Sequence, residues 1–110
     1  MSGSGGGGYG GGGFPPEEVS CDRLAFDTQL SSPKADVVAR IDVDDVLSVG
    51  LDVQGAVQVV VIKLDNEIAG GITSPKMARL LECIRQGTRY TATVTAKSGG
   101  QVSVRISPVR

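Results

Sequence analysis

Hydrophobic and polar positions alternate through much of this chain, in runs that predict short β-strands. Residues 24–30 place mainly apolar side chains at even positions, which is typical of a strand buried on one face. Residues 57–64 have almost no polar face, as expected of a central strand that is buried on both sides. Residues 88–96 and 102–107 alternate on either side of a Lys-Ser-Gly-Gly turn, and this pattern predicts a hairpin.

Two more strands are predicted between these runs. Residues 46–53 follow an acidic turn at residues 42–45, and residues 67–72 follow an Asp-Asn turn. The second of these strands carries Gly70 and Gly71, which indicates a bulge or a place where another backbone segment comes close.

The clearest helix signal lies in the second half of the chain. Ser74 is a suitable N-cap, Pro75 is a suitable first helical residue, and Gly87 is a stop signal. Four apolar residues between them follow the i, i+3, i+4, i+7 spacing of one helix face: Met77, Leu80, Leu81 and Ile84. We therefore expect a helix whose apolar stripe packs on the core.

A shorter helix is predicted after the first strand. Ser32 is a natural N-cap, and Pro33 has no amide proton to leave unsatisfied at the first helical position. Val37, Val38 and Ile41 would share the apolar face of this helix. Because the first two are β-branched, a strand at this position is the alternative.

The chain contains two versions of one pattern. Residues 30–34 read Leu-Ser-Ser-Pro-Lys and residues 72–76 read Ile-Thr-Ser-Pro-Lys, and each run precedes a helix-like stretch, a turn and two strand-like runs. Apolar positions fall in step at an offset that drifts from 42 to 45: Val38/Leu80, Ile41/Ile84, Leu47/Tyr90, Val57/Val102 and Val61/Ile106. We therefore predict an α+β fold, a six-stranded barrel-like antiparallel sheet with two helices and a pseudo-twofold β-α-β-β repeat at residues 24–64 and 67–108.

These repeats form one predicted domain at residues 19–110, after a glycine-rich tail at residues 1–18. Glycine loses much backbone entropy on ordering and offers nothing to bury, so we expect the tail to be disordered. We interpret the tail as a linker. The alternative is a weak binding role in which Tyr9 and Phe14 stack on bases or aromatic groups.

Targeting signals and cysteine usage favour a cytoplasmic protein. No apolar stretch is long enough to span a membrane, and the N-terminus lacks the basic-then-apolar layout of a signal peptide. Cys21 and Cys83 are too few for a disulfide framework, and their separation fits no zinc site. We therefore expect both cysteines to be reduced, in a protein that makes no membrane contact.

Charge is nearly balanced overall but unevenly distributed along the chain. Residues 1–66 hold ten acidic and four basic residues, a net charge of −6, whereas residues 67–110 hold two acidic and seven basic residues, a net charge of +5. A basic stripe is the electrostatic footprint of phosphate binding. The predicted nucleic-acid-binding residues are those that would share an exposed surface: Lys76, Arg79, Arg89 and Arg105.

The residue inventory argues against an enzyme. The chain has no histidine, which removes the usual general base and the commonest metal ligand, so we expect no cofactor and no metal. Ser-x-Lys pairs occur at Ser32/Lys34 and Ser74/Lys76, but helix capping explains both serines.

Residues 57–106 resemble the core of HIRAN-type domains. The resemblance rests on an apolar strand, the segment Asp-Asn-Glu-Ile-Ala-Gly-Gly-Ile at residues 65–72, a helix that begins Met-Ala-Arg-Leu-Leu at residue 77, and a closing hairpin. HIRAN-type domains are small six-stranded barrels with two helices, found alone in bacteria or fused to helicases, and some bind single-stranded DNA ends. Gln-Val-Val-Val at residues 58–61 stands where that family has Asp-Pro-Asn-Ala, so the family's DNA-binding residues map to no position here. The duplicated order is also similar to the cradle-loop barrels.

Together these features predict a non-catalytic binding module. The first hypothesis is single-stranded DNA or RNA binding through the basic C-terminal half. The alternative is a protein-interaction or oligomerisation module, in which the acidic half of one molecule meets the basic half of a neighbour.

Overall fold

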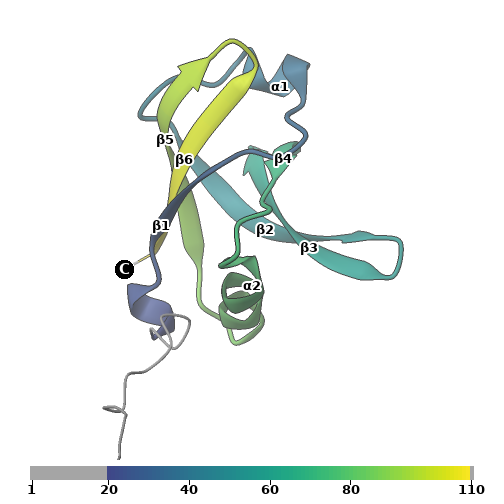
Figure 1. Ribbon diagram of the computed structural model, residues 1–110, viewed down its shortest axis with the longest axis vertical. Coiled ribbons are helices and arrows are strands. Elements are labelled where there is room, and N and C mark those ends of the chain that lie inside the picture. The colour runs from purple at the N-terminus through teal and green to yellow at the C-terminus, as the bar shows by residue number, and fades with distance from the viewer. Residues whose placement is uncertain (1–19, 110) are drawn as a thin grey trace, which may run out of the picture.

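The computed structural model describes residues 20–109, so the tail predicted at residues 1–18 lies outside the described part. Figure 1 shows one curved sheet with two α-helices and a short 3₁₀ helix. The elements in chain order are η3 (Cys21–Arg23), β1 (Phe26–Gln29), α1 (Ala35–Val38), β2 (Val46–Gln54), β3 (Val57–Leu64), β4 (Glu67–Gly71), α2 (Met77–Arg85), β5 (Tyr90–Ser98) and β6 (Gln101–Pro108). The predicted succession of β-α-β-β followed by β-α-β-β is confirmed.

The six strands form one antiparallel sheet in the order β1-β6-β5-β2-β3-β4. The strand order is symmetric with respect to the two halves. If β1 is exchanged with β4, β2 with β5 and β3 with β6, the same order is read from the opposite edge of the sheet. A twofold arrangement of two β-α-β-β units would have this property. A common origin of the two halves as a repeat stays a prediction.

The core lies on the concave face of the sheet. Tyr90, Ala92 and Val94 of β5 alternate inward, and so do the three matching residues of β6, as the sequence pattern predicted. Helix α2 adds Leu80 and Cys83, both of which are fully buried. These residues belong to a single continuous apolar cluster.

The sheet is not closed into a barrel, which corrects the barrel-like prediction. Strands β1 and β4 are its two edges, and an isolated bridge between Ser31 and Gly71 joins the segment after β1 to β4. Both backbone hydrogen bonds of this bridge are 2.8 Å long. Ser31 lies two residues beyond the end of β1 and Gly71 is the last residue of β4, and the bridge is not continued as a ladder.

Gly70 allows a close approach of the backbone where these edges meet. A Cβ atom on Gly70 would lie 3.0 Å from the Ser31 carbonyl oxygen and 3.1 Å from the Leu30 Cβ. The register between β3 and β4 also shifts at this point, between Ile62 and Lys63. The bulge and the close backbone approach predicted for Gly70 and Gly71 are therefore both confirmed.

Both helices begin two residues later than predicted. Lys34 precedes α1 and Lys76 precedes α2, and neither forms a side-chain cap. Ser32 has a φ of 50° and is not an N-cap. The segment before the helix is instead held against β4, because Ser31 pairs with Gly71 and the Lys34 amide bonds the Ala69 carbonyl. The predicted end of α2 is confirmed: Gly87 has a φ of +103°, a conformation that glycine adopts without strain.

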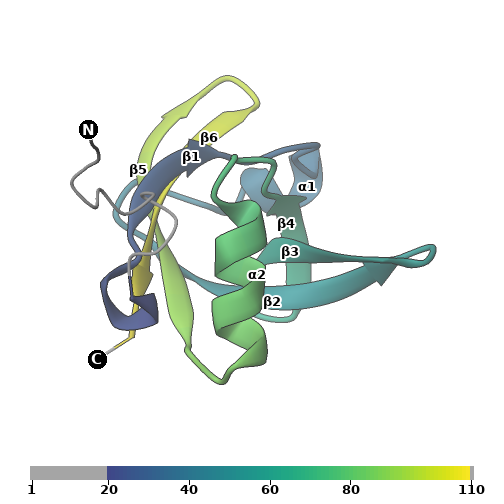
Figure 2. The same cartoon turned by 60° about the horizontal axis from the view of Figure 1, so that its bottom comes forward.

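Strands β2 and β3 extend beyond the body of the domain as a two-stranded arm, defined here as residues 49–59 (Figures 1 and 2). β2 pairs with β5 only at residues 46–48, and β4 pairs with β3 only at residues 61–64. The prediction that β3 is buried along its whole length is therefore wrong at its outer end, where Val57 is 61% exposed.

Within residues 20–109, no helix combines the length and the hydrophobicity needed to cross a bilayer.

Burial on α2 predicts unequal costs for two neighbouring leucines. Leu80 is fully buried, whereas Leu81 is only partly buried against the core. We expect Leu80→Ala to lower the free energy of unfolding by about 2–5 kcal/mol, since it empties a packed site. Leu81→Ala should cost clearly less in the same urea titration. Equal losses would show that the helix is rotated from the orientation described here.

Candidate binding surfaces

Two of the four predicted basic residues lie at α2, on the core side of the sheet. The Lys76 ammonium lies 5.9 Å from the centroid of the Phe26 ring, within the range of a cation–π contact. Arg79 forms an ion pair with Glu82, one turn along the same helix.

The other two predicted residues lie at β5 and β6. Arg105 is exposed on β6 and forms an ion pair with Asp27 of β1 at 3.3 Å. Arg89 is exposed immediately before β5. Phe26 and Asp27 are consecutive residues of one strand and therefore point to opposite faces of the sheet. Lys76 and Arg105 thus contact opposite faces of β1, and the structure does not bring them into one groove.

Two further basic residues of the C-terminal half are also engaged within the domain. Arg85 donates two hydrogen bonds, of 2.6 and 2.8 Å, to the Gln58 side-chain oxygen. Lys97 donates a hydrogen bond to the Ile41 carbonyl at 2.7 Å. These contacts tie the charges to local partners instead of presenting them as one continuous stripe.

A different surface lies along the outer edge of β3. The Val60 carbonyl accepts a hydrogen bond from the Ile72 amide, so the backbone polar groups of Val60 face the β4 side. Residues two apart in a strand orient these groups alike, which places the Gln58 amide and carbonyl on the same edge. Within residues 20–109, no strand pairs with this edge at Gln58, since β4 reaches only to Val61.

A cavity of about 310 Å³ lies beside this edge. Val59 and Val61 line one side, and the segment that contains Ser32 and Lys34 lines another. Lys34 is the one charged residue among those that line the cavity; the other contributors are apolar side chains, glycines, hydroxyls and Gln54.

The arm is also uncharged over its outer part. Residues 53–62 contain no Asp, Glu, Lys, Arg or Pro, and Val53 and Val57 are 65% and 61% exposed. Native edge strands are usually protected from further pairing by charges, by proline or by a covering segment. The sequence showed this uncharged run, but it was interpreted as a strand buried on both sides, so the exposed edge was missed.

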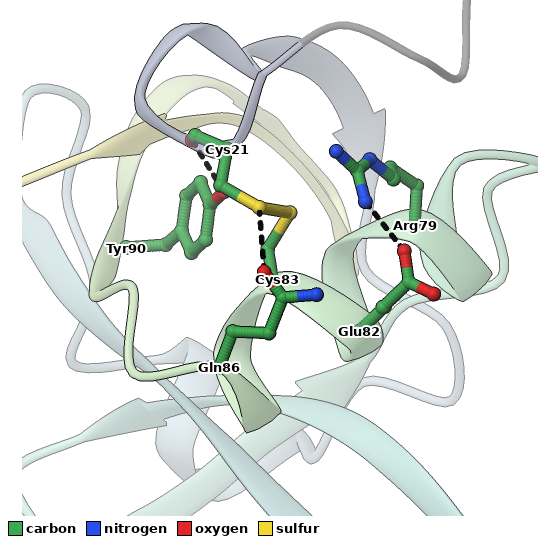
Figure 3. The surroundings of a disulfide bond; sticks show 6 residues. All are labelled: Cys21, Arg79, Glu82, Cys83, Gln86 and Tyr90. Atoms are coloured by element: carbon green, nitrogen blue, oxygen red, sulfur yellow. Dashed lines mark hydrogen bonds and ion pairs between the residues drawn. A yellow bond between two sulfur atoms is a disulfide. The ribbon is translucent and has the colours of Figure 1, made fainter.

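Cys21 and Cys83 form a disulfide, which corrects the prediction that both are reduced (Figure 3). The bond joins η3 to the buried face of α2 across 62 positions of sequence, with Cα atoms 5.5 Å apart. This distance lies within the range that a disulfide requires. Disulfides are rare in the cytosol, so the bond weighs against the predicted cytoplasmic location.

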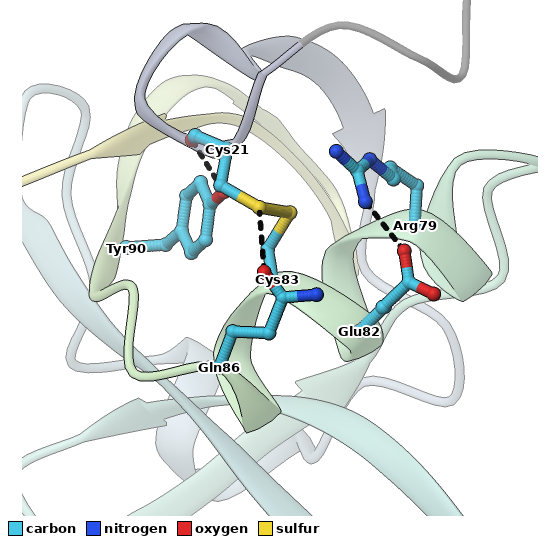
Figure 4. A network of polar contacts seen from close by, with 6 residues as sticks. All are labelled: Cys21, Arg79, Glu82, Cys83, Gln86 and Tyr90. Carbon is cyan, nitrogen blue, oxygen red and sulfur yellow. Dashed lines mark hydrogen bonds and ion pairs between the residues drawn. A yellow bond between two sulfur atoms is a disulfide. The ribbon is translucent and has the colours of Figure 1, made fainter.

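The disulfide lies within a small polar network (Figure 4). The Tyr90 hydroxyl donates a hydrogen bond to the Cys21 carbonyl at 2.6 Å, which ties β5 to η3. Burial raises the pKa of Tyr90, Arg79 opposes this rise, and Asp22 adds to it. The neutral phenol is the form that donates this bond, so the environment favours the form that the contact needs.

Neither serine of the two Ser-x-Lys pairs is a helix N-cap, which corrects the capping predicted for Ser32 and Ser74. The Ser74 hydroxyl oxygen accepts a hydrogen bond from the Lys76 backbone amide at 3.2 Å, a local turn contact. Residues 20–109 contain no cluster of three His, Cys, Asp or Glu side chains that could hold a metal ion. The absence of catalysis stays a prediction.

Reduction of the disulfide should destabilise the domain. Cross-linking across this separation restricts the unfolded chain, and such bonds typically contribute about 2–4 kcal/mol. We expect a reductant to lower the free energy of unfolding by this amount in a urea titration. A Cys21→Ser variant is the control, because it should start at the lower stability and not respond to reductant. An equal response of both proteins would contradict the disulfide.

No family model matches the chain, and comparison with curated proteins and with solved structures found no match either. The resemblance to HIRAN-type domains therefore stays a prediction.

Proposed function

We propose that this chain is a non-catalytic protein-binding module that accepts an extended segment of a partner along the outer edge of β3. The observation that supports this proposal is the uncovered backbone at Gln58, on an arm with no charge between residues 53 and 62. An added strand forms main-chain hydrogen bonds with such an edge, and pockets beside the edge give side-chain selectivity.

The cavity beside β3 supports the same proposal. Its apolar lining at Val59 and Val61 suits an aliphatic side chain of the added segment. The Lys34 ammonium would favour a partner that carries a carboxylate near this side chain. A segment that pairs with β3 therefore has both a backbone register and a selective contact.

Nucleic-acid binding is the second candidate. Arg89 and Arg105 are both exposed, and Arg105 shares its face of β6 with Ser103, beside Thr93 of β5. Two guanidinium groups beside hydroxyls could contact successive phosphates of a single strand. This proposal now rests on two of the four predicted residues, since Lys76 lies on the other face of β1.

We also propose that the two halves of the domain have a common origin. The Leu30 amide bonds the Val102 carbonyl and the Ile72 amide bonds the Val60 carbonyl, so the two donors and the two acceptors each differ by 42 residues. The acceptor match differs from the predicted alignment, which pairs Val102 with Val57. This equivalence supports two copies of one β-α-β-β unit.

The edge proposal predicts a specific effect of proline at position 58. Gln58→Pro removes the amide that faces the open edge and leaves the β2–β3 ladder intact, because that amide points away from β2. Peptides selected from a random library on the wild-type domain should bind Gln58→Pro at least about tenfold more weakly, measured by calorimetry.

Gln58→Ala is the matched control. It removes the same side chain, including the contact with Arg85, but keeps the backbone amide. We expect Gln58→Ala to bind the selected peptides like the wild type. If no selected peptide distinguishes the proline variant from the alanine variant, the edge is not the binding surface.

The nucleic-acid candidate predicts a change in salt dependence. Changing Arg89 and Arg105 together to Ser should weaken binding of a single-stranded oligonucleotide and flatten the logarithmic salt slope by about two, one for each lost phosphate contact. The double change of Lys34 and Arg40 to Ser removes the same charge from the first half and is the control. No binding by the wild type at low salt would exclude this function.

A further inference from the structure

We propose that the partner of the β3 edge is the free C-terminus of another protein, added parallel to β3 with its carboxylate in the cavity beside Val60. This inference rests on the proposed function, because it names the kind of segment that pairs with the same edge. It accounts for three features of this surface together: the open backbone at Gln58, an amide without an acceptor at Val60, and the lysine that lines the cavity.

The open edge of β3 stops at Val60. The Ile72 amide donates a hydrogen bond to the Val60 carbonyl at 3.2 Å, so an added strand cannot continue past this residue in the plane of the sheet. A segment that pairs with Gln58 must therefore end beside Val60 or bend out of the sheet there. A chain end meets this limit without a bend, and it brings a charged group, either a carboxylate or an ammonium.

Two groups beside the end of this edge favour the carboxylate. The Val60 amide faces the same side as the Val60 carbonyl, and within residues 20–109 the reverse bond, from this amide to the Ile72 carbonyl, is not formed. Val60 is fully buried, and a buried amide without an acceptor is costly. Lys34 is the one charged residue that lines the cavity, so it would attract a carboxylate and repel an ammonium.

A carboxylate beside Val60 determines the direction and the register of the added segment. A segment that ends there runs parallel to β3, with its last residue opposite Val59. In a parallel ladder, this last residue donates its amide to the Gln58 carbonyl and directs its carboxylate at the Val60 amide. The Gln58 amide then donates to the carbonyl of the residue two positions before the end.

The same register brings the last side chain to the apolar part of the cavity. Residues that lie opposite each other in a sheet point to the same face, so the last side chain lies next to Val59, on the face where Val59 and Val61 line the cavity. The side chain two positions earlier lies next to Val57 and covers a valine that is 61% exposed. The expected partner therefore ends with an aliphatic residue, any residue, a second aliphatic residue and a free carboxylate.

The test compares peptides that differ only in their C-terminal group. Decapeptides are selected on the wild-type domain from a random library displayed with free C-termini, and the selected sequences should have an aliphatic last residue. Each sequence is then synthesised as the free acid, as the C-terminal amide, and with two glycines added after the last residue. We expect the amide and the extended form to bind at least about tenfold more weakly than the free acid in calorimetry.

A charge change at Lys34 tests the second partner of the carboxylate. Lys34→Gln should weaken binding of the free acid about tenfold and should affect the amide clearly less, because the amide has no charge to lose. Arg23→Gln is the matched control, since it removes one positive charge from an exposed position that does not line the cavity. It should bind the free acid like the wild type.

The direction of the added segment has a readout of its own. In the proposed register, the fifth residue from the end of the peptide lies beside Gly55. A spin label at that residue should broaden the amide NMR signal of Gly55 more strongly than that of Thr73, which lies at the other end of the open edge. Stronger broadening at Thr73 would show the opposite direction.

Equal binding of the acid, the amide and the extended form would overturn the proposal, and so would stronger broadening at Thr73. If the three forms bind equally but Gln58→Pro still binds them more weakly than Gln58→Ala does, only the free C-terminus is excluded and the proposed function stands. If the proline and alanine variants bind alike, or if no peptide is selected, the proposed function fails as well.

Discussion

The paired backbone hydrogen bonds between Ser31 and Gly71 determine how this sheet encloses its core. They join the ends of the two edge regions, each at 2.8 Å, and they hold the curved sheet around one apolar cluster. Gly70 is what allows the approach, because a Cβ at that position would press against Ser31 and Leu30. Because of the same contact, α1 begins only at Ala35, and the segment with Ser31, Ser32 and Lys34 lines one side of the cavity.

That closure also leaves part of the sheet uncovered. β4 ends at Gly71 and the chain then turns toward α2, so among the described residues the outer half of β3 is paired with β2 on one edge and with no strand on the other. Helix α2 contacts one face of the arm through Arg85 and Gln58, but a side chain on a face cannot satisfy backbone groups on an edge. The open edge of β3 is thus a consequence of how the core is closed. No charged side chain protects it from pairing with a further strand.

Local patterns predicted what depends on local chemistry. Sequence patterns located all six strands: alternation predicted residues 24–30 and the closing hairpin, a continuous apolar run predicted residues 57–64, and preceding turns predicted the other two. Gly70 correctly indicated a close approach. The disulfide could not be predicted, because the proximity of Cys21 and Cys83 depends on how η3 lies against α2 across 62 positions. The open edge was missed for a similar reason: the sequence of β3 does not show how far β4 extends alongside it. The predicted basic residues were spread over two faces because strand orientation, rather than sequence proximity, decides which side chains meet.

The two hairpins of the domain occupy equivalent positions in the predicted repeat, yet only one has an unprotected arm. The β5–β6 hairpin carries Lys97 near its turn, and this ammonium is bonded to the Ile41 carbonyl of the other half. The β2–β3 hairpin has Gln54, Gly55 and Ala56 at its turn, and Asp52, two positions before Gln54, is the charged residue that precedes them. Lys97 lies on β5, the counterpart of β2, so the edge that corresponds to the outer edge of β3 belongs to β6. β3 extends three residues beyond Val60, which is bonded to Ile72, whereas β6 extends one residue beyond Val102, which is bonded to Leu30, and a longer stretch of β3 is therefore left uncovered.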